Sequence, residues 1–327
     1  MDFVQLSQAF LSYFSILLSI LQCKVSVLSN LGRVFISFLD TMLSLNFRLC
    51  SMSPCTISLD DKTTMHFWTP NRRQLNKPTL VLIHGYGGNS RWQFFTQVWP
   101  LSRSFNLYVL DLLFFGKSYT NWTDRSEMFQ ARCIREGLKR LSVNNFSVVG
   151  ISYRGYVTYR MAEIYQDEVE KVVIMSSGVC YTDDQKEKQL KKIGRNVFDL
   201  IMPEKAQDMR LFMNLCIYKS SPFKLIPNFF LTGFVQTICK KNRKEKLELA
   251  EHMLSQKADP NLPILTKKTL LIWGEKDNIF PVFLAHQLQR SSENESRLFR
   301  KRKSSFTTQH EMNCQHSWLI RYFFLYT

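Results

Sequence analysis

Three continuous apolar runs, each followed by a glycine-containing turn, recur along the first half of the chain, at residues 78–83, 106–111 and 148–151. Apolar runs without polar alternation are typical of strands buried on both faces of a sheet. Between the second and third runs, four apolar residues share one helical stripe: Ala131, Ile134, Leu138 and Leu141. Ser126 is placed to cap that helix. This alternation of strand and helix predicts an α/β protein with a parallel sheet.

The third run leads into a Gly-x-Ser turn at Gly150 and Ser152, followed by a helix-like segment. A serine on a tight turn between strand and helix predicts an exposed nucleophile with backbone N–H groups nearby to hold an oxyanion. The usual pattern has a second glycine two residues after the serine, where strand and helix approach closely. Arg154 occupies that position and Gly155 follows one residue later. We therefore expect Arg154 to crowd the contact, and Arg154→Gly to raise thermal stability.

Five motifs in order resemble those of plant serine esterase and lipase-like proteins of the α/β-hydrolase superfamily. They are Phe67–Pro70, Leu80–Gly87, Asp111–Ser118, Gly150–Gly155 and Trp273–Asp277. The resemblance covers roughly residues 50–298. It implies an α/β-hydrolase fold, with a mostly parallel central sheet flanked by helices and a helical cap inserted before the acid-bearing strand. It also implies a serine hydrolase that cleaves a carboxylic ester through an acyl-enzyme, with no cofactor and no metal.

The resemblance assigns roles residue by residue. Ser152 would be the nucleophile and Asp277 the acid, and the backbone N–H groups of Tyr86 and Tyr153 would form the oxyanion hole. His84 is expected to shape the oxyanion loop rather than act as the base. The motif residues that support these turns are His84, Gly85, Gly87, Gly150 and Gly155.

The base is the residue that the motifs do not supply. The resemblance implies a Gly-His pair about 29 residues after the acid, where this chain has Phe306. His310 is the candidate, with His316 as the alternative, because His286 follows the acid too closely. We expect weak hydrolysis from this chain. The alternative function is a non-catalytic small-ligand binder or receptor, or a decayed enzyme, on the same fold; epoxide hydrolysis is disfavoured because it requires an aspartate at Ser152.

Composition divides the chain into five parts. They are residues 1–45, a hydrophobic N-terminal extension; 46–178, the first part of the hydrolase core; 179–263, the helical cap; 264–298, the second part of the core; and 299–327, an atypical basic C-terminal tail. Seven cap residues are expected either to form an acyl pocket for a small hydrophobic ester or apolar ligand or to pack the cap onto the sheet: Phe198, Leu211, Phe212, Leu215, Cys216, Phe229 and Phe230.

Charge and cysteine content restrict the other function classes. The net charge of +16 is concentrated in the tail and cap, and without a nucleic-acid-binding motif it does not predict nucleic-acid binding. The eight cysteines show no metal-ligand spacing, which favours free thiols and argues against secretion. Residues 3–23 carry no charge and are long enough to cross a bilayer as a helix. We therefore expect a cytoplasmic or membrane-associated protein, with membrane association through residues 3–23, or an amphipathic arm there that packs on the body.

Overall fold

A twisted sheet forms the centre of the computed structural model, which describes residues 30–216, 225–259, 262–290, 296–301, 320 and 323. The strand order is β1-β2-β4-β3-β6-β7-β8-β9, with β5 paired to β2. The pairs from β4 to β9 are parallel, and β1, β2 and β5 join them antiparallel. The strands are β1 (Met52–Ser58), β2 (Thr63–Pro70), β3 (Thr79–Ile83), β4 (Asn106–Asp111), β5 (Tyr119–Thr120), β6 (Phe146–Ile151), β7 (Val169–Met175), β8 (Lys268–Gly274) and β9 (Ser296–Lys301). The expected mostly parallel sheet is confirmed.

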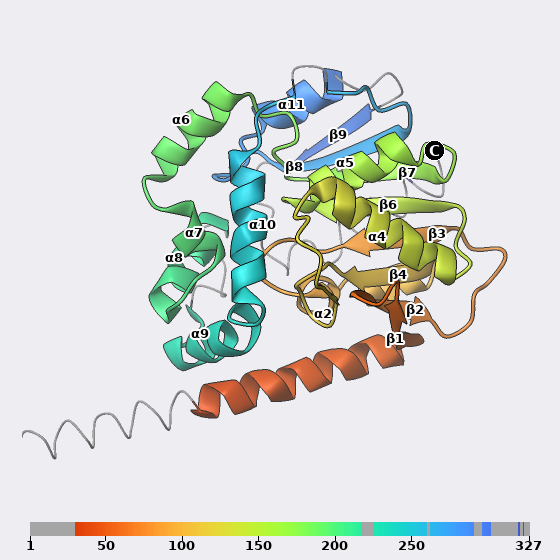
Figure 1. Cartoon of the computed structure of the whole chain (residues 1–327), viewed down its shortest axis with the longest axis horizontal. Coiled ribbons are helices and arrows are strands. Elements are labelled where there is room, and N and C mark those ends of the chain that lie inside the picture. The colour runs from red at the N-terminus through yellow and green to blue at the C-terminus, as the bar shows by residue number, and fades with distance from the viewer. Residues whose placement is uncertain are drawn as a thin grey trace, which may run out of the picture.

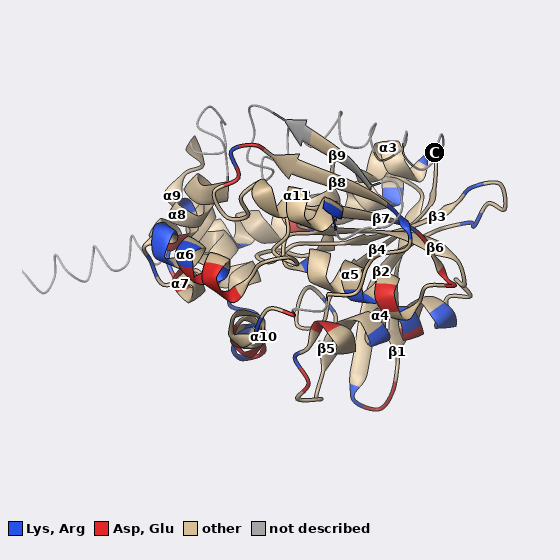
Figure 2. Ribbon diagram, turned by 90° about the horizontal axis from the view of Figure 1, so that it is seen from above, with Lys and Arg blue, Asp and Glu red and all other residues tan. Residues whose placement is uncertain are grey.

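Helices cover both faces of the sheet, with α4 and α5 on one face and α3 on the other (Figure 2). The helices outside the cap are α2 (Ser90–Phe94), α3 (Val98–Ser102), α4 (Glu127–Arg140), α5 (Arg154–Ile164) and α11 (Phe283–Arg290). Ser126 caps α4, because its hydroxyl accepts a hydrogen bond from the N–H of Phe129 at 3.1 Å. All residues of β3, β4 and β6 are buried, which explains why these strands are apolar without alternation.

A group of helices between β7 and β8 stands beside the carboxyl ends of the parallel strands (Figure 1). They are α6 (Asp183–Ile193), α7 (Val197–Ile201), α8 (Ala206–Cys216), α9 (Asn228–Phe234), the π-helical turn η2 (Val235–Cys239) and α10 (Arg243–Ser255). α10 is tied to the core by an ion pair between Glu248 and Arg125 at 2.8 Å. The Asn242 side chain, next to α10, donates to the carbonyl of Phe114 at 3.1 Å. These helices therefore form a cap over the carboxyl edge of the parallel strands.

Both ends of the described chain extend past the expected boundaries. A helix occupies residues 30–49 and so continues beyond residue 45. β9 continues past residue 298 to Lys301, because Lys301 still pairs with Gly274 of β8. Ile320 and Phe323 are helical and buried in the main core, so the tail after 298 contributes to the fold. Within the described residues, no helix is long and apolar enough to cross a membrane, and residues 3–23 lie outside that part of the chain.

Candidate active site

Ser152 occupies the turn between β6 and α5. Its φ of +62° is left-handed, a conformation that costs energy for a residue with a side chain and that persists only where the surroundings enforce it. Two hydrogen bonds enforce it here. The N–H of Ser152 donates to the carbonyl of Met175 at the end of β7, and the N–H of Gly155 donates to the carbonyl of Ser152, both at 2.9 Å. The serine is thereby held at the carboxyl edge of the sheet.

Gly150 and Gly155 are the positions of close approach around this turn. A Cβ added to Gly150 would collide with the Thr158 hydroxyl, and one added to Gly155 would collide with the side chain of Ser177. The helix α5 starts at Arg154, and the Arg154 side chain lies over the Phe115 ring. Gly155, one residue later than in the usual pattern, is the glycine in close contact with Ser177 and with Ile174 of β7. This placement argues against Arg154 crowding the contact between strand and helix, and the effect of Arg154→Gly on stability stays a prediction.

The Arg154 side chain is completely buried in a cage of aromatic rings. Its guanidinium carbon lies 4.4 Å from the ring centre of Phe115, 4.7 Å from that of Tyr153 and 5.2 Å from that of Tyr86. The guanidinium nitrogens have no hydrogen-bond partner within the described part of the chain. Burial lowers the pKa of Arg154 to about 10. Lys246, from the cap, places its ammonium 5.0 Å from the Phe115 ring centre on the same cage.

The loop after β3 is supported from beneath by His84. Its Nε2 accepts a hydrogen bond from the N–H of Leu112 at 3.1 Å, so Nδ1 carries the proton and donates to the carbonyl of Gly85 at 2.8 Å. Burial, followed by repulsion from Arg154, lowers the pKa of His84 to about 4. With both ring nitrogens engaged, this neutral imidazole is not available as a base. Gly87 turns the loop with a φ of +97°.

Two backbone N–H groups at this edge are free. Neither the N–H of Tyr86 nor that of Tyr153 donates a hydrogen bond within the described residues. Tyr153 directly follows the serine at the start of α5, where helix N–H groups lack intrahelical acceptors. The Tyr86 hydroxyl donates to the carbonyl of Lys246, which ties its loop to the cap.

Asp277 lies on the loop after β8. Its Oδ1 accepts hydrogen bonds from the N–H groups of Ile279 at 2.9 Å and Phe280 at 2.8 Å. Burial raises the pKa of Asp277, and these two hydrogen bonds act in the opposite direction. Asp277 is thus a fixed, largely desolvated carboxyl group at the same sheet edge as Ser152.

One cavity of about 420 Å³ brings these groups together, and its lining includes Ser152, Asp277, Tyr86 and Tyr153. Its apolar wall comes mainly from the cap. Of the seven expected pocket residues, the cavity is lined by Phe212, Cys216 and Phe230, and not by Phe198, Leu211, Leu215 or Phe229.

The cap wall follows helical geometry. The α8 residues that line the cavity are Met209, Phe212, Met213 and Cys216, spaced as one helical face, so Leu211 and Leu215 point elsewhere. The two methionines were not singled out from the sequence, although their spacing in α8 carries the signal. From the segment between β7 and α6, Ser176 and Tyr181 also line the cavity without having been predicted.

None of the described histidines, His66, His84, His252 and His286, lines the cavity. The candidates His310 and His316 lie outside the described residues. Within the described ranges, no group of three histidine, cysteine, aspartate or glutamate side chains could hold a metal ion.

Comparison with known proteins identifies the fold family. The alpha/beta hydrolase fold family matches residues 78–311, so the chain belongs to that family. It is 25% identical over 222 residues to a 2-hydroxy-6-oxononadienedioate/2-hydroxy-6-oxononatrienedioate hydrolase of Pseudomonas, covering 63% of this chain and 73% of that protein. A 1-acylglycerol-3-phosphate O-acyltransferase of Arabidopsis thaliana is 30% identical over 121 residues, which are 35% of this chain. The chain spans only 29% of the length of that acyltransferase.

Solved structures share the fold. A membrane phospholipase A superposes with a TM-score of 0.72 at 17% identity, covering 97% of this chain and 98% of that one. A thermophilic esterase from Thermogutta terrifontis superposes with a TM-score of 0.63 at 18% identity, covering 83% and 98%. The relatives thus include hydrolases, and these structural likenesses establish the fold alone.

Proposed function

We propose that the chain is a serine hydrolase that cleaves a carboxylic ester through an acyl-enzyme on Ser152. One observation carries the proposal. A serine in a strained left-handed turn shares a cavity with two residues, Tyr86 and Tyr153, whose backbone N–H groups have no acceptor among the described residues. Such N–H groups stabilise the negative oxygen that forms when a hydroxyl attacks an ester carbonyl.

In the proposed reaction, Ser152 Oγ attacks the carbonyl carbon while its proton passes to a base, and the N–H groups of Tyr86 and Tyr153 hold the oxyanion. Collapse of the intermediate expels the alcohol, which takes the proton from the base. The base then takes a proton from water, and the water oxygen attacks the carbonyl carbon of the acyl-serine. When this second intermediate collapses, Ser152 Oγ takes the proton back from the base and the carboxylic acid is released.

We propose that the base comes from the residues after Lys301, with His310 as the candidate and His316 as the alternative. β9 runs parallel to β8 and pairs Lys301 with Gly274, so the chain leaves the sheet at the edge where the Asp277 loop begins. Triads of this fold follow the chain order serine, acid, histidine. Because two amides hold Asp277 Oδ1, Oδ2 is the oxygen left to orient an imidazole.

The character of the cavity supports a small hydrophobic ester as substrate. Lys186 is the one cation among the described lining residues, and its ammonium already donates to carbonyls of the cap, including that of Gln256 at 3.0 Å. A dicarboxylate, such as the substrate named for the Pseudomonas hydrolase, would require a free cation on the wall. A neutral acyl chain requires only apolar contact, which the α8 methionines and phenylalanine provide.

A fluorophosphonate probe tests the nucleophile. We expect the purified protein to be labelled at Ser152 and Ser152→Ala to lose both the label and hydrolysis of short p-nitrophenyl esters. Ser176→Ala is the matched control for the label, because Ser176 lines the same cavity and also has a positive φ, and we expect this variant to keep the label at Ser152. Labelling that survives in Ser152→Ala would refute the assignment. Labelling of Ser152 without turnover of any ester would favour the binder or decayed-enzyme alternative.

The base is tested separately with His310→Ala and His316→Ala. We expect hydrolysis by the native chain to be weak, and to fall about a hundredfold in the variant that lacks the base, since general-base catalysis contributes at least that much. Labelling at Ser152 together with unchanged hydrolysis in both variants would show that neither histidine is the base.

A further inference from the structure

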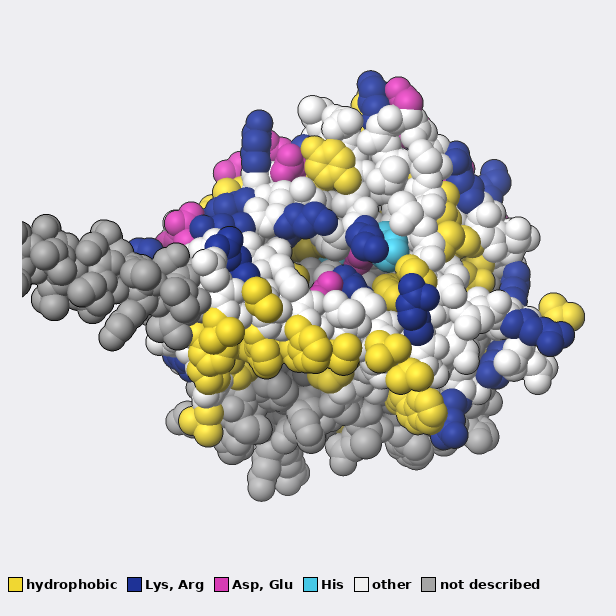
Figure 3. All heavy atoms as spheres, turned by 90° about the horizontal axis from the view of Figure 1, so that it is seen from below, with side chains coloured by type: hydrophobic (Ala, Val, Ile, Leu, Met, Phe, Trp, Pro, Cys, Tyr) yellow, Lys and Arg dark blue, Asp and Glu magenta, His cyan; other side chains and the backbone are white. Residues whose placement is uncertain are grey.

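The helix of residues 30–49 carries an exposed apolar stripe along its whole length. Its members are between 40% and 70% exposed: Leu31, Val34, Phe35, Phe38, Met42, Leu45 and Leu49. At about 100° per residue, all seven fall within an arc of roughly 100°. Figure 3 shows hydrophobic side chains in a row along this underside of the molecule. We will call these seven residues the apolar stripe.

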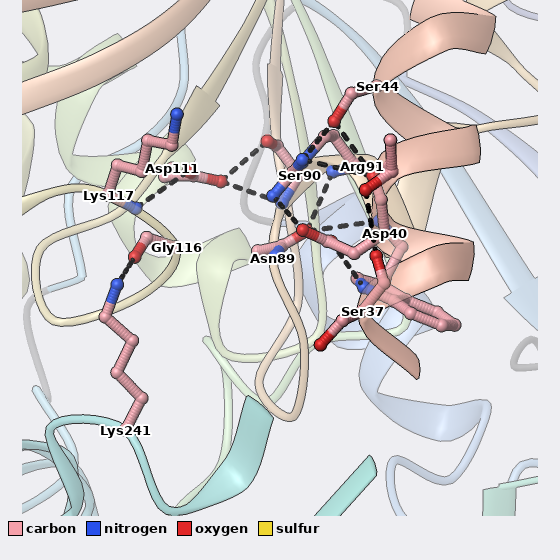
Figure 4. A network of polar contacts seen from close by, with 12 residues as sticks. Ser37, Asp40, Ser44, Asn89, Ser90, Arg91, Asp111, Gly116, Lys117 and Lys241 are labelled. Carbon is pink, nitrogen blue, oxygen red and sulfur yellow. Dashed lines mark hydrogen bonds and ion pairs between the residues drawn. The ribbon is translucent and has the colours of Figure 1, made fainter. Parts of the chain in front are cut away.

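The polarity of this helix is unusual, because several of its polar groups face the protein body. Asp40 forms an ion pair with Arg91 at 2.8 Å and accepts a hydrogen bond from the Trp92 indole at 3.0 Å. Ser44 accepts a hydrogen bond from Arg91 as well. Figure 4 shows this network linking the helix through Asn89 and Ser90 to Asp111 of the core. The helix is thus docked by these polar contacts together with the buried side chains of Ile36 and Phe47, while the seven residues of the apolar stripe face outward.

The net positive charge of the helix favours an anionic surface. The only acidic residue of the described helix, Asp40, is neutralised by Arg91. The remaining charged side chains, Arg33 and Arg48, are exposed near the two ends of the stripe. Basic residues that flank an apolar helical face interact with anionic lipid headgroups while the apolar face enters the acyl boundary.

The stripe also lies next to the wall of the acyl cavity. Gly32 contacts the backbone of Gly233 in α9 so closely that a Cβ on either glycine would collide with the other chain segment. The Phe35 ring packs against Phe230 with ring centres 5.9 Å apart, and Phe230 lines the cavity. A lipid surface beneath the stripe would therefore be adjacent to the cap helix that forms the pocket.

We propose that the apolar stripe binds the surface of a phospholipid bilayer that contains anionic lipids, with the helix lying in the plane of the interface. The described helix would then add a second attachment to the one expected for residues 3–23, which precede it in the chain and carry no charge. The stripe is about 27 Å long, since its ends are separated by 18 residues at 1.5 Å each. This proposal does not depend on ester hydrolysis.

Co-sedimentation of the full chain with vesicles tests the proposal. We expect the wild type to bind vesicles of phosphatidylcholine with one third phosphatidylglycerol, and to bind pure phosphatidylcholine less. Phe38→Asp/Leu45→Asp should weaken binding to the anionic vesicles at least tenfold. Ser37→Asp/Thr41→Asp is the matched control, since it adds the same charge at exposed positions on the polar side of the same helix.

Each other outcome contradicts part of the proposal. Equal loss of binding in both double variants would show that added charge alone is responsible. Full binding by Phe38→Asp/Leu45→Asp would place membrane attachment elsewhere in the chain. The wild type could instead fail to bind vesicles and dimerise in sedimentation analysis. If only Phe38→Asp/Leu45→Asp then lost dimerisation, the stripe would be an interface between two copies. Circular dichroism of both variants verifies that they remain folded.

Discussion

The guanidinium carbon of Arg154 lies 4.4 Å from the ring centre of Phe115, in a cage in which the side chain is completely buried. Burying an unpaired charge costs several kcal/mol, whereas each desolvated cation–π contact contributes up to about 2 kcal/mol. Three rings can therefore roughly balance the cost of burial. We therefore expect the volume of the Arg154 side chain to matter more for stability than its charge.

This balance yields a prediction for two variants of Arg154. Arg154→Met keeps the volume and removes the charge, so its free energy of unfolding should stay within about 1 kcal/mol of wild type or rise. Arg154→Gly empties the cage, so it should destabilise the protein by roughly 3 kcal/mol, as other large-to-small core substitutions do. Urea denaturation measures both. A more stable Arg154→Gly would restore the interpretation that the arginine is crowded.

Because the turn at Ser152 is left-handed, we predict that replacing this serine by glycine raises stability while it removes the nucleophile. Glycine adopts a φ of +62° without strain, so Ser152→Gly should raise the free energy of unfolding by about 1 kcal/mol. Ser152→Ala keeps the Cβ and should bring no such gain, while both variants lose the nucleophile. Thermal denaturation compares them directly. Equal stability of the two variants would mean that the turn stores no strain.

Gly155 should tolerate no side chain. A Cβ there would overlap the Ser177 side chain and approach Ile174 Cγ2 at 3.2 Å, and overpacking of this kind costs about 1–3 kcal/mol. We expect Gly155→Ala to be destabilised by that amount and Gly155→Ala/Ser177→Gly to recover part of it. No recovery in the double variant would show that the backbone, rather than Ser177, sets the limit.

His84 predicts a dependence of stability on pH. Its pKa of about 4 in the folded state is below the unfolded value of 6.5, so the unfolded chain binds more protons between these values. The contribution of neutral His84 to the free energy of unfolding is present above pH 6.5 and is lost as the pH falls toward 4. Between pH 7 and pH 5 the loss should be about 2 kcal/mol for this residue.

His66 provides the internal comparison, because burial also lowers its pKa to about 4. We expect His84→Gln to show roughly half of the wild-type loss over this range in urea denaturation at a series of pH values. Glutamine can still donate to Gly85 and accept from Leu112. An unchanged slope would mean that His84 does not titrate in this range in either state.

The sheet and the serine turn could be predicted because both depend on local sequence. Unbroken apolar runs specify strands buried on two faces, and Gly150 before Ser152 marks the turn. The direction of Arg154 could not be predicted, since it depends on where Phe115 and Tyr86 lie in space. An arginine one residue before the close contact has the same sequence pattern whether it collides with β7 or enters a cage.

The cap wall was only partly predictable for a similar reason. Residue type identifies apolar side chains in α8, but which face of the helix meets the cavity depends on how the cap docks on the core. The prediction included Leu211 and Leu215, whereas the wall is built from the face of α8 that includes Met209 and Met213. The exposure of the apolar stripe could not be predicted either, because a buried apolar helical face and an exposed one have the same spacing of apolar residues in the sequence.

The contact between Gly32 and Gly233 has a consequence for the order of folding. Gly32 and Gly233 are separated by about 200 residues of sequence, which include most of the cap. During synthesis the helix of residues 30–49 emerges long before α9, so Gly32 and Phe35 lack their partners in α9 for most of translation. Exposed apolar surface on a nascent chain is prone to aggregation. We therefore expect the N-terminal helix to be the segment of this protein that depends most on chaperones while it is being made.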